Sequence, residues 1–337
     1  MTVRKSYYPY LDGLRAAAAL YVVMCHMITE FKFNDLYNYP LLKKYSVLVF
    51  SNGVLAVDFF IVVSGFCLAI PMINSNSFRL KNGPLSFYYQ RYKRIYLPYL
   101  FATIFSVFLI AVAIGNKTGT HWDLSIPVTK VDIIRHLLLI QDIFYSSCDK
   151  INHAFWSISV ECRIYLFFPL IILIWRYYGP LVTLCGSILL SAALLLITVE
   201  LNRFNKDFNI DVEGVNPYII LFVLGMIGSY AAFSHETKLV TFRQNAPWWL
   251  IILILGIAVL TTQRLALHGH FPYFFELTDL LAGCCSVCIL IAINEGKYYL
   301  HKLFSFRPLV IVGSFAYSIY LIHAPFIQLI WQRTCIY

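Results

Sequence analysis

Two ionisable residues, Arg15 and His26, lie eleven positions apart in the first apolar segment, LDGLRAAAALYVVMCHMI. Eleven residues make about three turns of an α-helix, so both side chains project from one face, roughly 16 Å apart along the axis. Ionisable groups are costly in a segment that can enter a bilayer, and they therefore indicate a functional site. His26 could act there as a general base or as a covalent nucleophile. Arg15 could stabilise negative charge in the same site, or anchor the helix at the lipid headgroups.

Asp58 and Glu161 are acidic residues in or beside two other apolar segments, VDFFIVVSGF and HAFWSISVE. A carboxylate within a membrane needs a partner, and either one could hold the His26 imidazole in the tautomer that leaves one nitrogen free to accept a proton. Glu161 could instead form a structural ion pair with Arg163. We expect both acidic residues to belong to the catalytic site of His26.

Three cations cluster at the start of a later apolar segment, in the stretch FYYQRYKRIYLPY. Arg91 and Arg94 are three residues apart, and on a helix such like charges repel unless an anion lies between them. Guanidinium groups bind phosphates well, so this pair predicts a site for a phosphate-bearing ligand. The alternative is positive charge that only marks one side of the membrane. Ser64 and Gly65 would allow close backbone approach, either to a ligand or to a neighbouring helix.

His323 lies two residues before Pro325 in the last apolar segment, within SFAYSIYLIHAP. It is a candidate second histidine of the site, but a polar residue beside a proline often only satisfies backbone groups that the proline leaves unpaired. Six other histidines lie in connecting segments and receive no role: His121, His136, His235, His268, His270 and His301.

The composition places these residues in a membrane protein. Hydrophobic residues make up 60% of the 337 and charged residues only 13%, and the mean hydropathy is +0.71. The formal charge of +9 is not accompanied by a solvated basic surface, which argues against nucleic-acid binding. The nine cysteines fall mostly in apolar stretches and form no disulfide framework. Cys285 and Cys288 have a metal-like spacing, but without a nearby histidine we expect no metal site.

Nine apolar windows are long enough to cross a bilayer, which predicts an all-α, polytopic bundle formed by one integral domain over residues 1–337. The windows are 14–31, 47–72, 96–114, 155–175, 180–200, 217–233, 248–267, 274–293 and 309–331. A tight turn at 176–180 separates the fourth from the fifth. The longest connection, 115–153, contains an apolar stretch at 133–145 that predicts an interfacial or re-entrant helix. A modest excess of lysine and arginine in alternate connections favours a cytoplasmic N-terminus.

Taken in order, five motifs resemble those of the acyltransferase 3 family of integral membrane acyltransferases. They are the first apolar segment with Arg15 and His26, VDFFIVVSGF, the Arg-x-x-Arg of 91–94, HAFWSISVE and SFAYSIYLIHAP. The resemblance extends from Tyr10 to about Pro325. It implies an enzyme that O-acylates cell-surface sugars or other exported molecules, with His26 in the catalytic role. It also implies ten spans, so we expect this chain to lack the last C-terminal helix or to carry a divergent one.

The resemblance further implies acyl-CoA, in the simplest case acetyl-CoA, as the donor, and a hydroxyl of a glycan or lipid-linked sugar as the acceptor. We expect the donor to bind Arg91 and Arg94 at the cytosolic mouth, with Ser64 and Gly65 in the same site, and its thioester to reach His26 at mid-depth. The acceptor would arrive from the other side or from within the bilayer. We expect a multi-pass protein of the bacterial inner membrane.

Two other functions stay open. A proton-coupled secondary transporter could use Asp58, Glu161 and His26 as a relay, although transporters usually show internal symmetry and the sequence has none that we find. The other alternative is a catalytically inactive relative that acts as a binding subunit.

Overall fold

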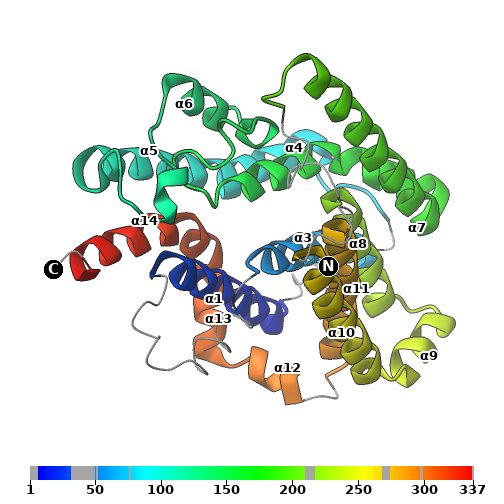
Figure 1. Ribbon diagram of the computed structural model, residues 1–337. Coiled ribbons are helices and arrows are strands. Elements are labelled where there is room, and N and C mark those ends of the chain that lie inside the picture. Colours follow the sequence, from blue (N-terminus) through cyan, green and yellow to red (C-terminus); the bar gives the residue numbers. More distant parts are fainter. Residues whose placement is uncertain are drawn as a thin grey trace.

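Helices form all the named regular elements of the protein, which confirms the all-α prediction. The computed structural model describes residues 7–31, 50, 52–75, 77–208, 217–267, 274–296 and 299–335. The longer helices are α1 (Pro9–Phe31), α3 (Val54–Asn74), α4 (Gly83–Arg91), α5 (Leu97–Leu109), α6 (Lys130–Leu137), α7 (Trp156–Phe204), α8 (Tyr218–Phe233), α9 (Thr237–Asn245), α10 (Trp248–Leu267), α11 (Phe274–Asn294), α13 (Arg307–Ser314) and α14 (Ala316–Cys335) (Figure 1). The short elements are α12 (Tyr299–Phe304), the π-helical turns Tyr92–Tyr96 and Ile110–Ile114, and the 3₁₀ turns His121–Leu124 and Gln141–Ile143.

Six of the described helices are long and apolar enough to cross a membrane, and counting each of two bent helix pairs as one span gives eight. This count takes α7 once, although its 49 residues far exceed the roughly 20 that a bilayer requires. Gly179 interrupts α7 with a φ of 81°, and Pro180 follows without a backbone N–H. The two parts of α7 run in different directions from this point (Figure 1), as the predicted turn at 176–180 requires. With α7 taken as two spans, the count agrees with the nine predicted.

The last predicted span, 309–331, is not one straight helix. α13 and α14 meet at an angle of 72°. α13 is held against the start of α1, where Gly313 lies so close that a Cβ atom would be 1.9 Å from the Asp12 carbonyl oxygen. α14 then turns away and packs along α1 (Figure 1). This span is bent because a tight contact with α1, which the local sequence does not show, fixes the direction of α13.

The ends of the helices gather on two sides of the bundle. We call the side that holds the start of α1 the inner end. There the Tyr10 hydroxyl donates a hydrogen bond to Asn294 at the end of α11. The outer end holds the connection 115–155, and Gln332 near the end of α14 donates a hydrogen bond to the Ile114 carbonyl there. That the inner end faces the cytoplasm stays a prediction.

Two glycines bring α3 and α8 into backbone contact. A Cβ at Gly65 would lie 2.0 Å from the Phe222 carbonyl oxygen, and one at Gly225 would lie 2.1 Å from the Val62 carbonyl oxygen. Small residues at such crossings let transmembrane helices pack closely, which supplies van der Waals energy where lipid offers no hydrophobic driving force. Of the two roles that the sequence allowed for Gly65, close approach to a ligand or to a neighbouring helix, the structure shows the contact with a helix.

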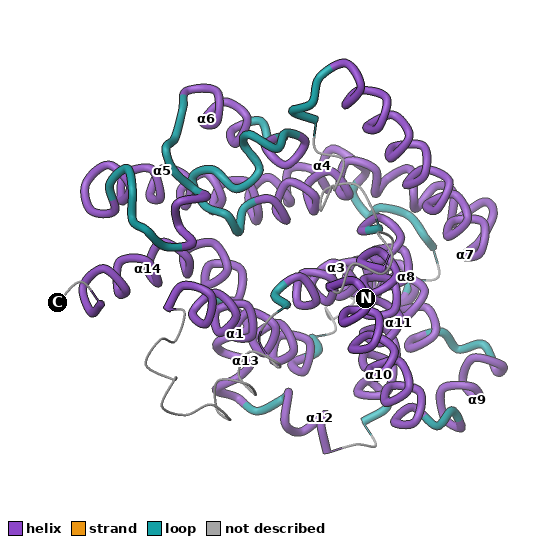
Figure 2. Tube along the Cα trace, in the orientation of Figure 1, coloured by secondary structure: helices purple, strands orange, loops and turns teal. Residues whose placement is uncertain are grey.

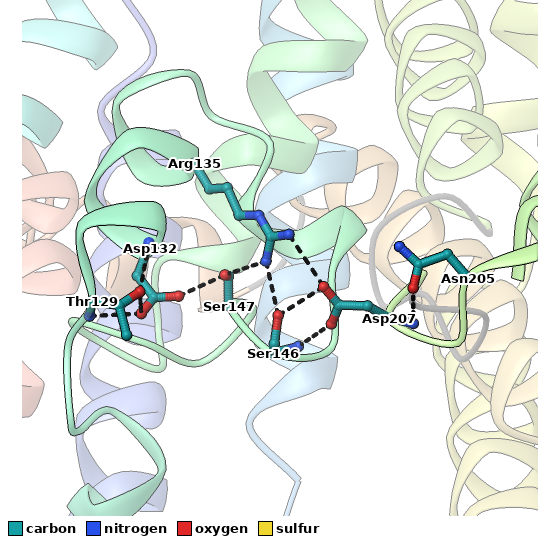
Figure 3. Close-up of polar contacts among 7 residues, drawn as sticks. All are labelled: Thr129, Asp132, Arg135, Ser146, Ser147, Asn205 and Asp207. Atoms are coloured by element: carbon teal, nitrogen blue, oxygen red, sulfur yellow. Dashed lines mark hydrogen bonds and ion pairs between the residues drawn. The ribbon is translucent and has the colours of Figure 1, made fainter.

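The outer connection, residues 115–155, consists largely of loops around α6 (Figure 2), and a polar network clamps it to the end of α7 (Figure 3). Arg135 on α6 donates hydrogen bonds to the Ser146 and Ser147 hydroxyls, and its other terminal nitrogen lies 3.2 Å from Asp207. Asp207 also accepts hydrogen bonds from the backbone N–H and the hydroxyl of Ser146. The apolar stretch predicted at 133–145 thus forms the end of α6 and a 3₁₀ turn, in a folded cap at the outer end.

His136, on α6 in this cap, makes the connection sensitive to acid. The side chain is fully buried, and burial lowers its pKa to about 4. In an unfolded chain the pKa is about 6.5, so the unfolded state binds the proton more tightly and stability falls as the pH drops below that value. A shift of this size corresponds to roughly 3 kcal/mol, lost by about pH 4.

We therefore expect the thermal midpoint of the detergent-solubilised protein to fall between pH 6.5 and 4. The variant His136→Gln keeps a donor for the Asp132 carbonyl that His136 Nδ1 contacts at 2.8 Å, and its midpoint should fall less over this range. Equal pH dependence of the two proteins would contradict the assignment to His136.

Candidate active site

Four histidines from separate segments meet at the outer end of α1. His26 Nδ1 lies 3.0 Å from His153 Nε2 and 3.3 Å from His323 Nε2. The ring of His121 packs edge-on against that of His153, with the ring centroids 4.7 Å apart. We call these four side chains the histidine cluster. Sequence reasoning found His26, left His323 open, and missed His121 and His153.

The segment that precedes α7 is held at this cluster by α14, in which Pro325 leaves a backbone carbonyl without its helical donor. The carbonyl of Leu321, four residues earlier, accepts a hydrogen bond from Asn152 Nδ2 at 3.1 Å instead. The Tyr320 hydroxyl donates to the Ala154 carbonyl at 3.0 Å. These two bonds fix the segment between Asn152 and Ala154 on α14. The proline was visible in the sequence, but the residue that would satisfy the free carbonyl was not.

Neither predicted carboxylate is found at the histidines in the described part of the chain. Glu161 accepts hydrogen bonds from the hydroxyls of Ser64 and Tyr165, toward the inner end. Asp58 is fully buried on α3, where it interacts with Asp279 of α11. The expected contact of Asp58 or Glu161 with the His26 imidazole is therefore not observed.

Arg163 does not pair with Glu161 as the structural alternative proposed. Its guanidinium forms an ion pair with Asp142, a buried residue in the outer connection. Glu161 is thus bonded to two hydroxyls, and the cation that lies near it is Arg94.

A second group of polar side chains, the inner polar cluster, surrounds Arg15. Arg15 Nη1 lies 2.9 Å from Asp12 Oδ1, and its Nη2 lies 3.2 Å from Cys67 Sγ. Arg94 is close enough to Arg15, Arg91 and Glu161 to interact electrostatically with all three. The cluster comprises Asp12, Arg15, Ser64, Cys67, Arg91, Arg94, Glu161 and Tyr165.

The chain geometry around Pro98 brings the two predicted arginines into this cluster. Pro98 has no N–H for the carbonyl of Arg94, and the preceding residues form a π-helical turn in which the Leu97 N–H bonds to the Tyr92 carbonyl. Arg91 at the end of α4 lies over the ring of Tyr165, 5.6 Å from its centroid.

The inner polar cluster has the charge of an anion site. Its three guanidinium groups face two carboxylates, those of Asp12 and Glu161, so positive charge is in excess. The Nε of Arg91 is buried and has no hydrogen-bond partner among the protein atoms. A buried donor without a partner is costly, and an anionic group of a ligand could satisfy it. The structure thus brings Arg91, Arg94 and Ser64 together with Arg15, whereas Gly65 packs against α8.

Two cavities of about 300 Å³ border the histidine cluster. The outer cavity is lined by four polar residues, Thr29, Thr120, His121 and Asp123, and by Leu124. The other is almost wholly apolar, lies between α1 and α14, and is lined by Val23, Met27, Ile319, Ile322, His323, Phe326, Ile327 and Ile330. Among the residues that the structure describes, no group of three or more His, Cys, Asp or Glu side chains is arranged to hold a metal ion.

Comparisons with known proteins identify the family of the chain. A family model described as an acyltransferase domain matches residues 8–337. The O-acetyltransferase OatA of Staphylococcus aureus is 24% identical over 333 residues, which cover 95% of this chain and 51% of that protein. The peptidoglycan O-acetyltransferase OatA of Listeria monocytogenes is 24% identical over 338 residues, covering 96% of this chain and 50% of that protein.

The chain spans about half the length of these relatives, and no solved structure matches it. The family match covers all five motifs, including Arg15 with His26 and Arg91 with Arg94. This multi-pass helical protein therefore belongs to the acyltransferase 3 family.

Proposed function

We propose that the chain is a membrane O-acyltransferase that moves an acyl group, in the simplest case acetyl, from acyl-CoA to a hydroxyl of a cell-envelope glycan. The observation that carries this proposal is the pairing of two sites on one helix. α1 holds Arg15 in a cationic cluster and, three turns further, His26 in a cluster of histidines. A phosphate-bearing donor and a base for a hydroxyl acceptor require these two kinds of site.

The donor phosphates bind at the inner polar cluster in this proposal. Arg15, Arg91 and Arg94 supply the guanidinium groups, and the Arg91 Nε supplies a buried donor that lacks a protein partner. Coenzyme A joins its phosphates to the thioester through a long, flexible arm, so the acyl group can extend along α1 toward His26. In this proposal the protein lies in a bacterial inner membrane, and its inner end faces the cytoplasm, where acyl-CoA is made.

The acceptor hydroxyl enters through the outer cavity. The lining hydroxyls of Thr29 and Thr120 and the imidazole of His121 suit a sugar, which presents many donors and acceptors. Asp123 gives this cavity a negative side chain, which favours a neutral hydroxyl group over an anionic one. Because the Listeria relative is named for peptidoglycan, a peptidoglycan sugar or its lipid-linked precursor is the acceptor we propose.

The chemistry follows from placing His26 between the two substrates. The acceptor oxygen attacks the thioester carbonyl carbon, a C–O bond forms, and the C–S bond breaks. His26 takes the hydroxyl proton as general base and returns it to the leaving thiolate, so no other reactant is consumed. An acyl-imidazole on His26 would be the covalent alternative, and label retained on the protein without acceptor would reveal it.

Loss of a guanidinium from the inner polar cluster tests the donor site. We expect Arg94→Ala to raise the KM for acetyl-CoA about 10- to 100-fold, because a charge-assisted hydrogen bond contributes roughly 1.5–3 kcal/mol. Arg79→Ala is the matched control, since this arginine is exposed near the same end of the bundle. Label transfer from radiolabelled acetyl-CoA to the envelope glycan in membranes measures both. A KM unchanged by Arg94→Ala would place the donor elsewhere.

The transporter alternative gains no support from these contacts. A proton relay would join Asp58, Glu161 and His26 through a chain of neighbours. Glu161 is bonded to the hydroxyls of Ser64 and Tyr165, Asp58 interacts with Asp279, and His26 contacts other histidines. Uptake by counterflow in proteoliposomes without acyl-CoA would nevertheless favour transport over transfer.

A further inference from the structure

The surroundings of His323 fix which of its nitrogens carries the proton. Its Nδ1 lies 2.7 Å from the Tyr320 carbonyl oxygen, which can only accept a hydrogen bond. Neutral His323 therefore has its proton on Nδ1, and its Nε2 is an acceptor. That Nε2 is 3.3 Å from Nδ1 of His26, so the contact is favourable when His26 carries its own proton on Nδ1.

His153 approaches the same nitrogen of His26 and can act in the same way. Its Nε2 lies 3.0 Å from His26 Nδ1, and its Nδ1 lies 3.2 Å from Ser125 Oγ. The serine oxygen already accepts a bond from the His153 backbone N–H and has a second lone pair for a second donor. His153 is buried, and burial lowers its pKa well below the ordinary value, so the ring is neutral at pH 7.

We propose that His153 and His323 together orient His26 by accepting from its Nδ1–H, which leaves His26 Nε2 unprotonated and free to take the proton of the acceptor hydroxyl. In the serine proteases a carboxylate bonded to the histidine Nδ1 has this role. Two neutral imidazoles take it here, and both are positioning residues. The inference rests on the proposed function and adds the tautomer of His26 and the residues that set it.

Neutral His153 and His323 suit a reaction in which His26 first takes a proton from the acceptor hydroxyl and then gives it to the leaving thiolate. Among the described residues, the titratable groups that interact with His26 are His153, His323 and His121, and the buried Glu30 lies one helical turn further along α1. When Nε2 accepts the hydroxyl proton, two lone pairs stabilise the Nδ1–H of the imidazolium through charge-assisted hydrogen bonds. Two neutral acceptors hold the imidazolium less strongly than a carboxylate at Nδ1 would, so it readily releases the proton to the leaving thiolate.

Three substitutions at His323 separate orientation from simple packing. His323→Leu removes the acceptor, and we expect kcat to fall about 10- to 100-fold with the KM for acetyl-CoA within about twofold of wild type. His323→Gln offers an amide oxygen to the His26 Nδ1–H and should keep roughly a third or more of kcat. His323→Asp adds a charge that stabilises the imidazolium, so the acidic limb of the kcat/KM pH profile should move up by about one unit or more.

Nitrogen-15 NMR of the histidine-labelled, detergent-solubilised chain reads the tautomer without any activity assay. The His26 signals are assigned by their loss in His26→Gln, and we expect a protonated Nδ1 and an unprotonated Nε2 at pH 7. A proton on Nε2, a kcat for His323→Leu equal to wild type, or a kcat for His323→Gln as low as for His323→Leu would each overturn the inference. If the expected tautomer is found but wild type transfers no acetyl group, the proposed function fails and the orientation stands.

Discussion

Replacing His26 by alanine should lower the rate of acetyl transfer by about a thousandfold, the largest effect we expect from one side chain. A positioned general base typically contributes 10²- to 10⁴-fold, and a covalent carrier would contribute at least as much. His26 contacts both His153 and His323, and the same cluster borders the outer cavity through His121. We therefore expect the acceptor hydroxyl to reach His26 from this cavity.

The measurement is transfer of label from radiolabelled acetyl-CoA to the envelope glycan, in membranes from an expressing bacterial strain. His235→Ala is the control, because His235 is exposed in the connection between α8 and α9. This variant should retain wild-type transfer. Size-exclusion profiles of the solubilised variants must match, so that lost activity reports chemistry and not folding. Unchanged transfer by folded His26→Ala would contradict the role of His26 as general base or acyl carrier.

The spacing of Arg15 and His26 was predictable because it depends only on the period of a helix. The sequence shows ten residues between them, all apolar apart from one tyrosine, and α1 runs without a break from Pro9 to Phe31. The two sites on one helix face follow directly. The same local logic predicted the break in α7 at Gly179 and Pro180, since both residues act on their own backbone.

The partners of His26 were not predictable from the same reasoning. His153 and His121 belong to the outer connection, and they reach α1 only because this segment is bonded to α14 and clamped to the end of α7. Asn152 donates a hydrogen bond to the Leu321 carbonyl, which Pro325 leaves without a helical donor. The two bonded residues are 169 positions apart in the sequence. A pairing over that distance has no local signal, and an acidic partner was expected only because carboxylates commonly orient histidines.

Glu161 lies beside other residues than the sequence predicted. It was expected beside His26, but α7 places it toward the inner end, where it accepts from Ser64 and lies near Arg94. One consequence is that Glu161 limits the positive charge of the inner polar cluster. Its part in binding or transfer stays a prediction.

Gly65→Ala should prevent the chain from folding, which is the second large effect we expect. The new Cβ would lie 2.0 Å from the Phe222 carbonyl oxygen and 2.9 Å from its carbon, both backbone atoms that cannot rotate away. α3 and α8 would have to separate, and the contact at Gly225 next to the crossing would be lost with them. Overpacking of this kind costs about 3 kcal/mol or more. The yield of monodisperse protein and its thermal midpoint in detergent measure the loss.

Gly186→Ala is the matched control because it makes the same substitution within a helix at a site with nothing within 4 Å of the new Cβ. It should fold as wild type, or slightly better, since alanine favours a helix over glycine by about 1 kcal/mol. The comparison also decides between two roles for Gly65. A donor-binding glycine would yield folded protein with a raised KM for acetyl-CoA, whereas a packing glycine yields little folded protein at all. Ser64→Ala completes the test, since Ser64 directly precedes Gly65 but its hydroxyl belongs to the inner polar cluster. We expect this variant to fold as wild type and to have a changed KM for acetyl-CoA.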